Sequence, residues 1–148
     1  MELLVKSLPL LAHGAATTLY LSAAAIVFAT ALGLVLALLQ LFGGLILRAL
    51  VEAYLYVVRG VPLLVLLFAM YYALPYADIQ IEPVTGGIVV IGLYFGAFMT
   101  EVFRAAVLSV PKGQWEAART LGLTTPCILL DVVFVQAMRV AGPPYINT

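Results

Sequence analysis

The charged and polar residues of this chain concentrate in one short run between two long apolar segments. Residues 109–122 have the sequence SVPKGQWEAARTLG, which brings Lys112, Gln114, Glu116, Arg119 and Thr120 together in one short run. Pro111 suits the first turn of a helix, where its missing N–H is no loss. Gly122 suits the left-handed residue that follows the last turn, and Pro126 disfavours continuation beyond it. The run therefore predicts a short polar helix between two membrane segments.

The chemistry that this helix offers is recognition rather than catalysis. Glu116 and Arg119 are spaced i, i+3 and can pair on its surface. Ala117, Ala118 and Leu121 give it a small apolar side that fits closely into a groove. An amphipathic helix resting on lipid is the alternative interpretation, but alanines anchor weakly in lipid because little apolar area is buried. A protein partner is favoured.

Further charges lie inside or beside apolar segments. Glu101 and Arg104 are also spaced i, i+3, and they either neutralise each other at the membrane interface or line a permeation path or inner gate. Arg59 has the same two interpretations, since an arginine can also extend to the interface with no further role.

The sequence offers no arrangement typical of an enzyme. It contains no phosphate-binding Gly-x-x-x-x-Gly-Lys loop, no nucleophile beside a base and no metal-ligand spacing. The single cysteine, Cys127, excludes an intrachain disulfide, and the single histidine, His13, excludes a multi-histidine site. The formal net charge is zero, which provides no basic surface for nucleic acid. We expect no catalytic residues, no cofactor and no nucleic-acid partner.

Composition identifies the elements that must position these residues. Of the 148 residues, 65% are hydrophobic and only 9% are charged, whereas a soluble domain is about half apolar and a quarter charged. The chain is therefore predicted to be an all-α polytopic membrane bundle forming one transmembrane domain, 1–148. Spans of about 20 residues are expected near 17–39, 54–75, 87–108 and 129–146, with the polar loop at 109–126. Residues 1–13 are expected to form a short interfacial helix. A signal peptide is disfavoured because the uncharged stretch, residues 14–47, is far longer than the apolar region of a signal peptide.

Small residues and one proline predict how the spans pack. Four small residues recur at every fourth position of the first span: Ala25, Ala29, Gly33 and Ala37. They align on one face where another helix can approach closely, and Gly92 and Gly96 repeat this spacing in the third span. The alternative is that alanine and glycine are simply common in membrane helices. Pro62 predicts a break after Arg59 and Gly60, because proline disfavours helix at its own position and the one before.

The distribution of charge predicts orientation. Five positive residues fall on one side of the predicted spans: Arg48, Arg59, Arg104, Lys112 and Arg119. Asp78 and Glu82 fall on the other. The positive-inside rule then puts the polar loop in the cytoplasm and the N-terminus outside, with Lys6 in weak disagreement.

Several motifs together resemble one family. Residues 116–122 (EAARTLG) are similar to the EAA loop of ABC importer permeases, and residues 109–115 (SVPKGQW) narrow the resemblance to permeases for polar amino acids such as histidine, basic amino acids and glutamine. Residues 56–64 (YVVRGVPLL) resemble the second core helix and residues 96–104 (GAFMTEVFR) the third. Val61, Phe134-Val135 and Gly142 depart from the family's usual residues.

The resemblance implies a fold of five core helices, of which this chain holds about four, so that it is truncated at its C-terminus. It implies a bacterial inner-membrane location and two identical or related permease chains. It further implies an extracytoplasmic binding protein that delivers the amino acid, and a cytoplasmic ABC ATPase dimer that binds and hydrolyses ATP. The coupling residues carried over from the motif are Gln114, Glu116, Ala117, Ala118, Arg119 and Gly122.

Two alternatives stay open at this point. A secondary transporter or channel module would need a polar site at mid-membrane, where the spans offer little beyond Thr30 and tyrosines. A non-functional permease fragment is the other alternative.

Overall fold

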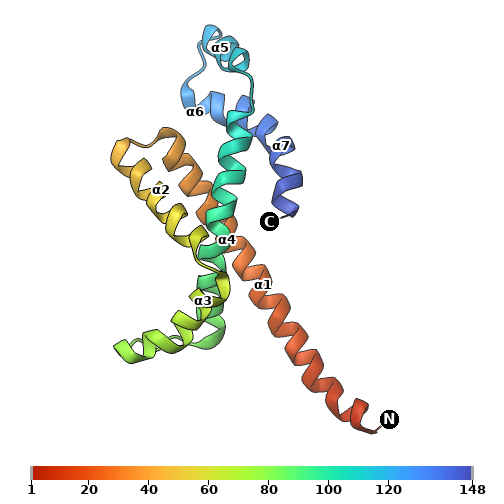
Figure 1. Cartoon of the computed structure of the whole chain (residues 1–148). Helices are drawn as coiled ribbons and strands as arrows, with labels where there is room; N and C mark the ends of the chain where they lie inside the picture. Colours follow the sequence, from red (N-terminus) through yellow and green to blue (C-terminus); the bar gives the residue numbers. More distant parts are fainter. Residues whose placement is uncertain (1, 148) are drawn as a thin grey trace.

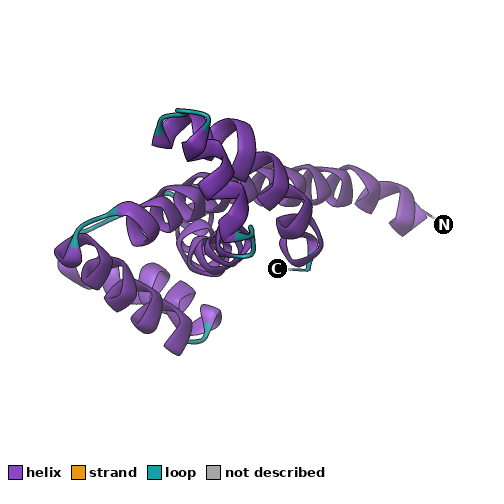
Figure 2. Ribbon diagram, turned by 90° about the horizontal axis from the view of Figure 1, so that it is seen from above, coloured by secondary structure: helices purple, strands orange, loops and turns teal. Residues whose placement is uncertain are grey.

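The computed structural model describes residues 2–147, with side chains from residue 7 onward, and every regular element in that range is a helix (Figures 1 and 2). The elements in chain order are α1 (Glu2–Phe42), α2 (Leu45–Gly60), α3 (Leu63–Phe68), the π-helix η1 (Ala69–Ala73), the 3₁₀ helix η2 (Leu74–Ala77), α4 (Pro83–Leu108), α5 (Lys112–Thr120), α6 (Thr125–Cys127), the π-helix η3 (Ile128–Val133) and α7 (Phe134–Ile146). Three helices in the described residues are long and apolar enough to cross a membrane, or four spans if the bent pair α2–α3 counts as one. The predicted all-α membrane bundle is confirmed.

The first helix is longer than its predicted span. α1 runs for 41 residues and contains Pro9, so the separate interfacial helix expected at 1–13 is wrong for the described residues. A proline removes one helical hydrogen bond, and the residues on both sides of Pro9 continue the helix. The N-terminal half of α1 extends away from the other helices (Figures 1 and 2).

The packing of α1 against α4 forms the centre of the molecule. The small residues predicted to form a face are buried: Ala25, Ala29, Gly33 and Ala37. The glycines of α4 receive larger side chains of α1, with Phe28 over Gly92 and Leu32 over Gly96. In the reverse direction Gly33 lies against the Met99 backbone. Small residues on both helices therefore let the backbones approach, as in other membrane helix pairs.

The second predicted span is not one continuous helix. α2 ends at Gly60, α3 begins at Leu63, and their axes differ by 96°. Val61 is extended, with φ −110° and ψ 130°, because the ring of Pro62 disfavours a helical conformation at the residue before it. The break was predicted from the sequence, and it divides the segment expected as one span at 54–75 into two helices at nearly a right angle (Figure 1).

The third helix begins earlier than predicted because a side chain caps it. Glu82 precedes Pro83, and its carboxylate accepts hydrogen bonds from the backbone N–H of Val84 (3.1 Å) and of Thr85 (2.7 Å) and from the Thr85 hydroxyl (2.7 Å). These bonds satisfy N–H groups that have no partner within the helix. α4 therefore starts at residue 83 rather than 87.

The cap makes the start of α4 sensitive to pH. The hydrogen bond from the Thr85 backbone, followed by those from the Thr85 hydroxyl and the Val84 backbone, lowers the pKa of Glu82 below its ordinary 4.5. Because the folded pKa is the lower one, this stabilisation is fully present above pH 4.5 and is lost as the pH falls through the folded pKa. We expect wild type to be more stable than Glu82→Gln at pH 7, with the difference shrinking toward pH 3. Unfolding in detergent at both pH values measures it. Glu116→Gln, which removes an exposed carboxylate that caps no helix, is the control; an equal pH effect in both variants would contradict the prediction.

The fourth span begins with a short α-helix and a π-helix before its longer α-helix. The apolar stretch Thr125–Ile146 comprises α6, η3 and α7, so the span begins before the predicted 129. Its C-terminal end is tied to α1 by a 2.8 Å hydrogen bond between the hydroxyls of Tyr145 and Thr30. The cluster that joins it to α4 and α5 comprises Ala106, Val110, Ala118, Ile128, Val133, Ala137 and Ala141.

Candidate functional site

The polar helix predicted from the sequence is α5, which lies beyond the end of α4 (Figure 1). Pro111 is the residue before the helix rather than a member of its first turn. Gly122 has φ +76°, the left-handed conformation predicted for it. Its N–H donates to the Arg119 carbonyl at 2.9 Å, and the Leu123 N–H donates to the Ala118 carbonyl at 3.2 Å. These bonds satisfy the last carbonyls of α5 and turn the chain toward α6.

One side of α5 is held by its own chain. Ala118 is 4% exposed and belongs to the cluster around Ile128, and Trp115 packs on the same cluster. Gln136 donates a hydrogen bond of 3.3 Å to the Gln114 side-chain carbonyl. The expectation that Ala118 lies on an outer face with Ala117 is therefore corrected. Residues 115 and 118 are i, i+3 neighbours that face inward together, and the periodicity of α5 alone could not say which face its own chain covers.

The opposite side of α5 is open. The exposed residues of α5 other than Gln114 are Lys112, Gly113, Glu116, Ala117, Arg119 and Thr120, and Leu121, which follows the helix, is also exposed. Leu121 is 80% exposed. Within the described residues Glu116 and Arg119 form no ion pair, so both charges are available to another molecule. α5 therefore packs against its own chain on one side and is exposed on the other.

The three charges predicted near a path or gate lie together. Glu101 accepts from Arg104 through Nη2 at 2.7 Å and Nε at 3.2 Å, both to Oε2. Its other oxygen, Oε1, is 3.7 Å from Nη1 of Arg59. The Arg59 guanidinium also lies 5.4 Å from the centre of the Phe98 ring, a distance suited to a cation–π contact. The i, i+3 pair was visible in the sequence, but the approach of Arg59 from α2 was not.

This cluster forms part of an open cleft of about 530 Å³ between α1, α2 and α4. Its lining residues are Gln40, Glu52, Leu55, Tyr56, Arg59, Gly60, Phe98 and Glu101. The side-chain oxygen of Gln40 is buried with no hydrogen-bond partner. Gln40 and Glu52 were not predicted as site residues from the sequence. Their only signal was that each is a polar residue at the edge of an apolar segment.

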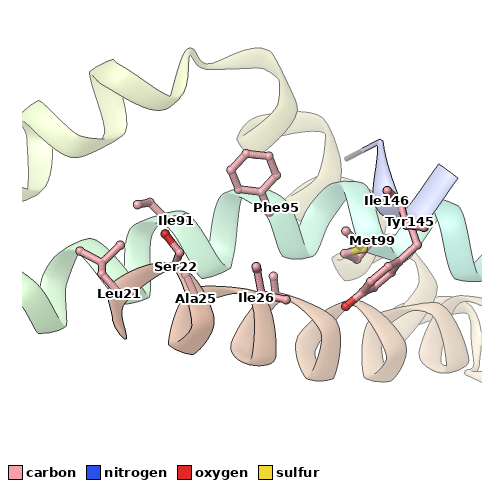
Figure 3. A pocket seen from close by; sticks show the side chains of 10 residues that line it. Leu21, Ser22, Ala25, Ile26, Ile91, Phe95, Met99, Tyr145 and Ile146 are labelled. Atoms are coloured by element: carbon pink, nitrogen blue, oxygen red, sulfur yellow. The ribbon is translucent and has the colours of Figure 1, made fainter. Parts of the chain in front are cut away.

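A second cavity, of about 400 Å³, lies between α1, α4 and the end of α7 (Figure 3). Leu21, Ala25 and Ile26 contribute apolar surface from α1, and Phe95 and Met99 contribute it from α4. Its polar groups are confined to Ser22 and to Tyr145, whose hydroxyl is already bonded to Thr30. This cavity has no charged lining residue, so the charged cleft is the better candidate for a polar ligand.

Comparisons with known proteins identify relatives that are membrane transport permeases. The family model described as "Binding-protein-dependent transport system inner membrane component" matches residues 29–148. The L-cystine transport system permease protein TcyB of Bacillus subtilis (strain 168) is 38% identical over 140 residues, covering 95% of this chain and 60% of the relative. The glutamine transport system permease protein GlnP of Escherichia coli (strain K12) is 36% identical over 143 residues, covering 95% of this chain and 65% of the relative.

A solved structure shares the fold. The structure titled "Crystal structure of an amino acid ABC transporter with histidines" superimposes with a TM-score of 0.86 at 32% identity, covering 97% of this chain and 67% of the solved chain. The chain spans less than two thirds of the length of the two permeases named above. On the family match and the shared fold, the chain belongs to the binding-protein-dependent transport system inner membrane components, a family of multi-pass transport permeases and not of enzymes.

Proposed function

We propose that the chain acts as a permease subunit of an ATP-driven importer for polar amino acids. The observation that carries the proposal is α5: its inner side is fixed by Trp115 and Ala118, and its outer side carries unpaired charges. The relatives are named as transport systems for L-cystine, glutamine, and histidine, lysine, arginine and ornithine. These substrates share the amino and carboxyl groups of an amino acid, which favours that substrate class.

The partners follow from this role. A cytoplasmic ABC ATPase dimer receives loop 109–126, a second permease chain completes the pathway within the lipid bilayer, and an extracytoplasmic binding protein delivers the amino acid. ATP binds to and is hydrolysed on the ATPase, so the permease needs no cofactor of its own. The charge distribution supports a cytoplasmic loop and an N-terminus outside. In this orientation the chain crosses the membrane in alternating directions at the expected spans 17–39, 54–75, 87–108 and 129–146.

The contacts of α5 suggest how motion passes into the membrane. The docking surface and the turn that follows it are formed by Gln114, Glu116, Ala117, Arg119 and Gly122. Ala118 packs the opposite side of α5 against the rest of the chain. Movement of α5 pulls η3 and α7 through the Trp115 and Ala118 contacts and the Gln114–Gln136 hydrogen bond. Arg59, Glu101 and Arg104 act as an inner gate: the Arg59–Glu101 pair joins α2 to α4 and must break when these helices separate, while Arg104 holds Glu101 within α4.

Co-purification tests the docking surface. A tagged chain expressed with the ATPase of its own cell is expected to retain that ATPase, and Glu116→Arg is expected to reduce the retained amount by about tenfold, since interface charge reversal costs several kcal/mol. Asp78→Arg reverses an exposed carboxylate in the loop before α4, away from α5, and serves as the matched control. Equal retention by both variants, or no ATPase on the wild-type chain, would refute the proposed docking.

A further inference from the structure

The segment that links α5 to α7 contains a change of helical register. The Ile128 N–H donates to the Thr124 carbonyl, four residues back, at 2.9 Å, as in an α-helix. The Phe134 N–H donates instead to the Leu129 carbonyl, five residues back. η3 is therefore a π-helix between the α-helical stretches α6 and α7. π-helices are rare, and a single turn of one inside an α-helix often marks a functional site.

The buried face of this span shows the same change of register. Its buried residues are Ile128, Val133, Ala137 and Ala141, separated by steps of five, four and four residues. In an α-helix, residues five apart point about 140° away from each other. In η3 both Ile128 (1% exposed) and Val133 (0% exposed) enter the cluster that also contains Ala118 of α5. η3 thus holds one residue more than a continuous α-helix would need.

A second apolar residue is available for the position that Ile128 occupies. In an uninterrupted α-helix with Val133 and Ala137 on the buried face, the residue four before Val133 would also face the cluster, and that residue is Leu129. Leu129 is half-buried and already packs against the cluster. Leucine and isoleucine have the same volume, and such exchanges disturb a core little. The segment can therefore fill one core position with Ile128 in a π-helix or with Leu129 in an α-helix.

The contacts of α7 decide which end of the span moves when the register changes. Ala137 and Ala141 are buried in the cluster that contains Ala106 of α4, and α7 runs beside α4 (Figure 1). The Tyr145 hydroxyl is bonded to that of Thr30 in α1 at 2.8 Å. These contacts hold α7 in place, so a change of register turns α6, and α5 with it, by one residue. One residue of α-helix corresponds to about 100° of rotation and 1.5 Å of rise.

One side chain ties the observed register to α5. The Gln136 amide group donates to the Val132 carbonyl at the end of η3 (3.2 Å) and to the Gln114 side-chain carbonyl in α5 (3.3 Å). Turning α6 carries Gln114 away from α7, so the bond between the two glutamines exists only in the π-helical arrangement. Gln136 is thus a positioning residue that holds α5 in its observed place.

We propose that η3 is a register switch that gives α5 two defined positions relative to the membrane helices. With Ile128 in the cluster, α5 lies as observed; with Leu129 in the cluster, η3 becomes α-helical and α5 turns away. Because a packed core accepts one side chain or the other and no intermediate rotation, the movement has two end positions. This inference rests on the proposed function, in which an ATPase moves α5, and adds the residues that take up the movement.

Deleting one exposed residue tests the switch. Leu130 is 66% exposed, and its deletion brings Ile128 to four residues before Val133. An uninterrupted α-helix then keeps Ile128 in the cluster, and no spare residue remains. We expect this variant to insert and to retain the ATPase. Its uptake in proteoliposomes with the ATPase and the binding protein is expected to fall by about tenfold or more, because turnover depends on a conformational step that is no longer available. Leu130→Ala keeps the number of residues, and as the matched control it is expected to transport like wild type.

Spin labels measure the register directly. The native Cys127 is exposed just before η3, and Met138→Cys, at a position 48% exposed, provides the second site in α7. We expect one main distance between the labels in the chain alone and a second distance when the ATPase is bound with ATP. Gln136→Leu removes the bond to Gln114 and is expected to populate the second distance without any ATPase. Gln80→Leu, in the exposed loop before α4, is the matched control and is expected to leave the distances unchanged.

The outcomes separate the register switch from the transport function. A single label distance under all conditions, or equal uptake by the Leu130 deletion and Leu130→Ala, would overturn the switch even if the ATPase is retained. A deletion variant that has lost its helix content by circular dichroism would also contradict it, because the α-helical register must keep the core filled. Two distances in Gln136→Leu in a chain that retains no ATPase would support the switch and refute the ATP-driven function.

Discussion

Replacing Gly33 with alanine is expected to destabilise the bundle by at least about 2 kcal/mol, because overpacking a close contact forces backbone shifts. A Cβ at Gly33 would overlap Cβ of Met99 and would lie 3.0 Å from both the Met99 carbonyl carbon and the Thr100 amide nitrogen. Two of these three atoms belong to the backbone of α4, so no side chain can rotate away. α1 and α4 would have to separate along the face where Ala29 and Ala37 are also buried.

Gly14→Ala provides the matched control for that prediction. Gly14 lies in the same helix, and a Cβ there would meet nothing within 4 Å. The substitution is expected to be neutral or stabilising by up to about 1 kcal/mol, since alanine favours helix over glycine. Reversible unfolding in mixed detergent micelles measures both free energies. Equal stabilities of the two variants would show that the α1–α4 contact is looser than described.

Replacing Gly122 with valine is expected to uncouple transport from ATP hydrolysis while leaving membrane insertion intact. Gly122 has φ +76°, and a Cβ there would meet no atom within 4 Å, so the penalty is conformational. A β-branched residue in the left-handed region costs roughly 1–3 kcal/mol. The turn after α5 is expected to relax to another conformation and to lose the bond from its N–H to the Arg119 carbonyl.

The measurement is amino acid uptake per ATP hydrolysed in proteoliposomes that contain the permease with its ATPase and binding protein. We expect uptake by Gly122→Val to fall by about tenfold or more, since the turn must reorganise by 1–3 kcal/mol at every docking event. Gly113→Val is the matched control, because Gly113 lies within α5 and a Cβ there also meets nothing. Uptake that falls equally in both variants would indicate a general effect on α5 rather than on its exit turn.

Local features of this chain were predictable because their causes are local. The excess of apolar residues requires lipid, and in lipid a helix satisfies its own backbone hydrogen bonds. The extended Val61 follows from the ring of Pro62, and the left-handed Gly122 follows from the absence of a Cβ. The alignment of Gly33 with Ala37 follows from 3.6 residues per turn. Apart from the overall composition, each of these depends only on a few neighbouring residues.

The candidate sites depended on contacts between distant helices. Ala117 and Ala118 are equivalent in composition, yet only Ala118 is buried, because η3 packs on that side of α5. In sequence, Arg59 on α2 and Glu101 on α4 are separated by α3, η1, η2 and a loop. The 96° break after Gly60 and the packing of α2 on α4 bring the two side chains to 3.7 Å.

The kind of helix, its breaks and its turns thus follow from hydrophobicity, proline and glycine along the chain. These features predicted a membrane protein with one exposed polar helix, and the resemblance of several motifs added the permease family. Which face of each helix meets which neighbour depends on the free energy of the whole packed bundle, and no short stretch of sequence contains it. For that reason the cleft that joins Gln40, Glu52 and Arg59 became visible only in the folded chain.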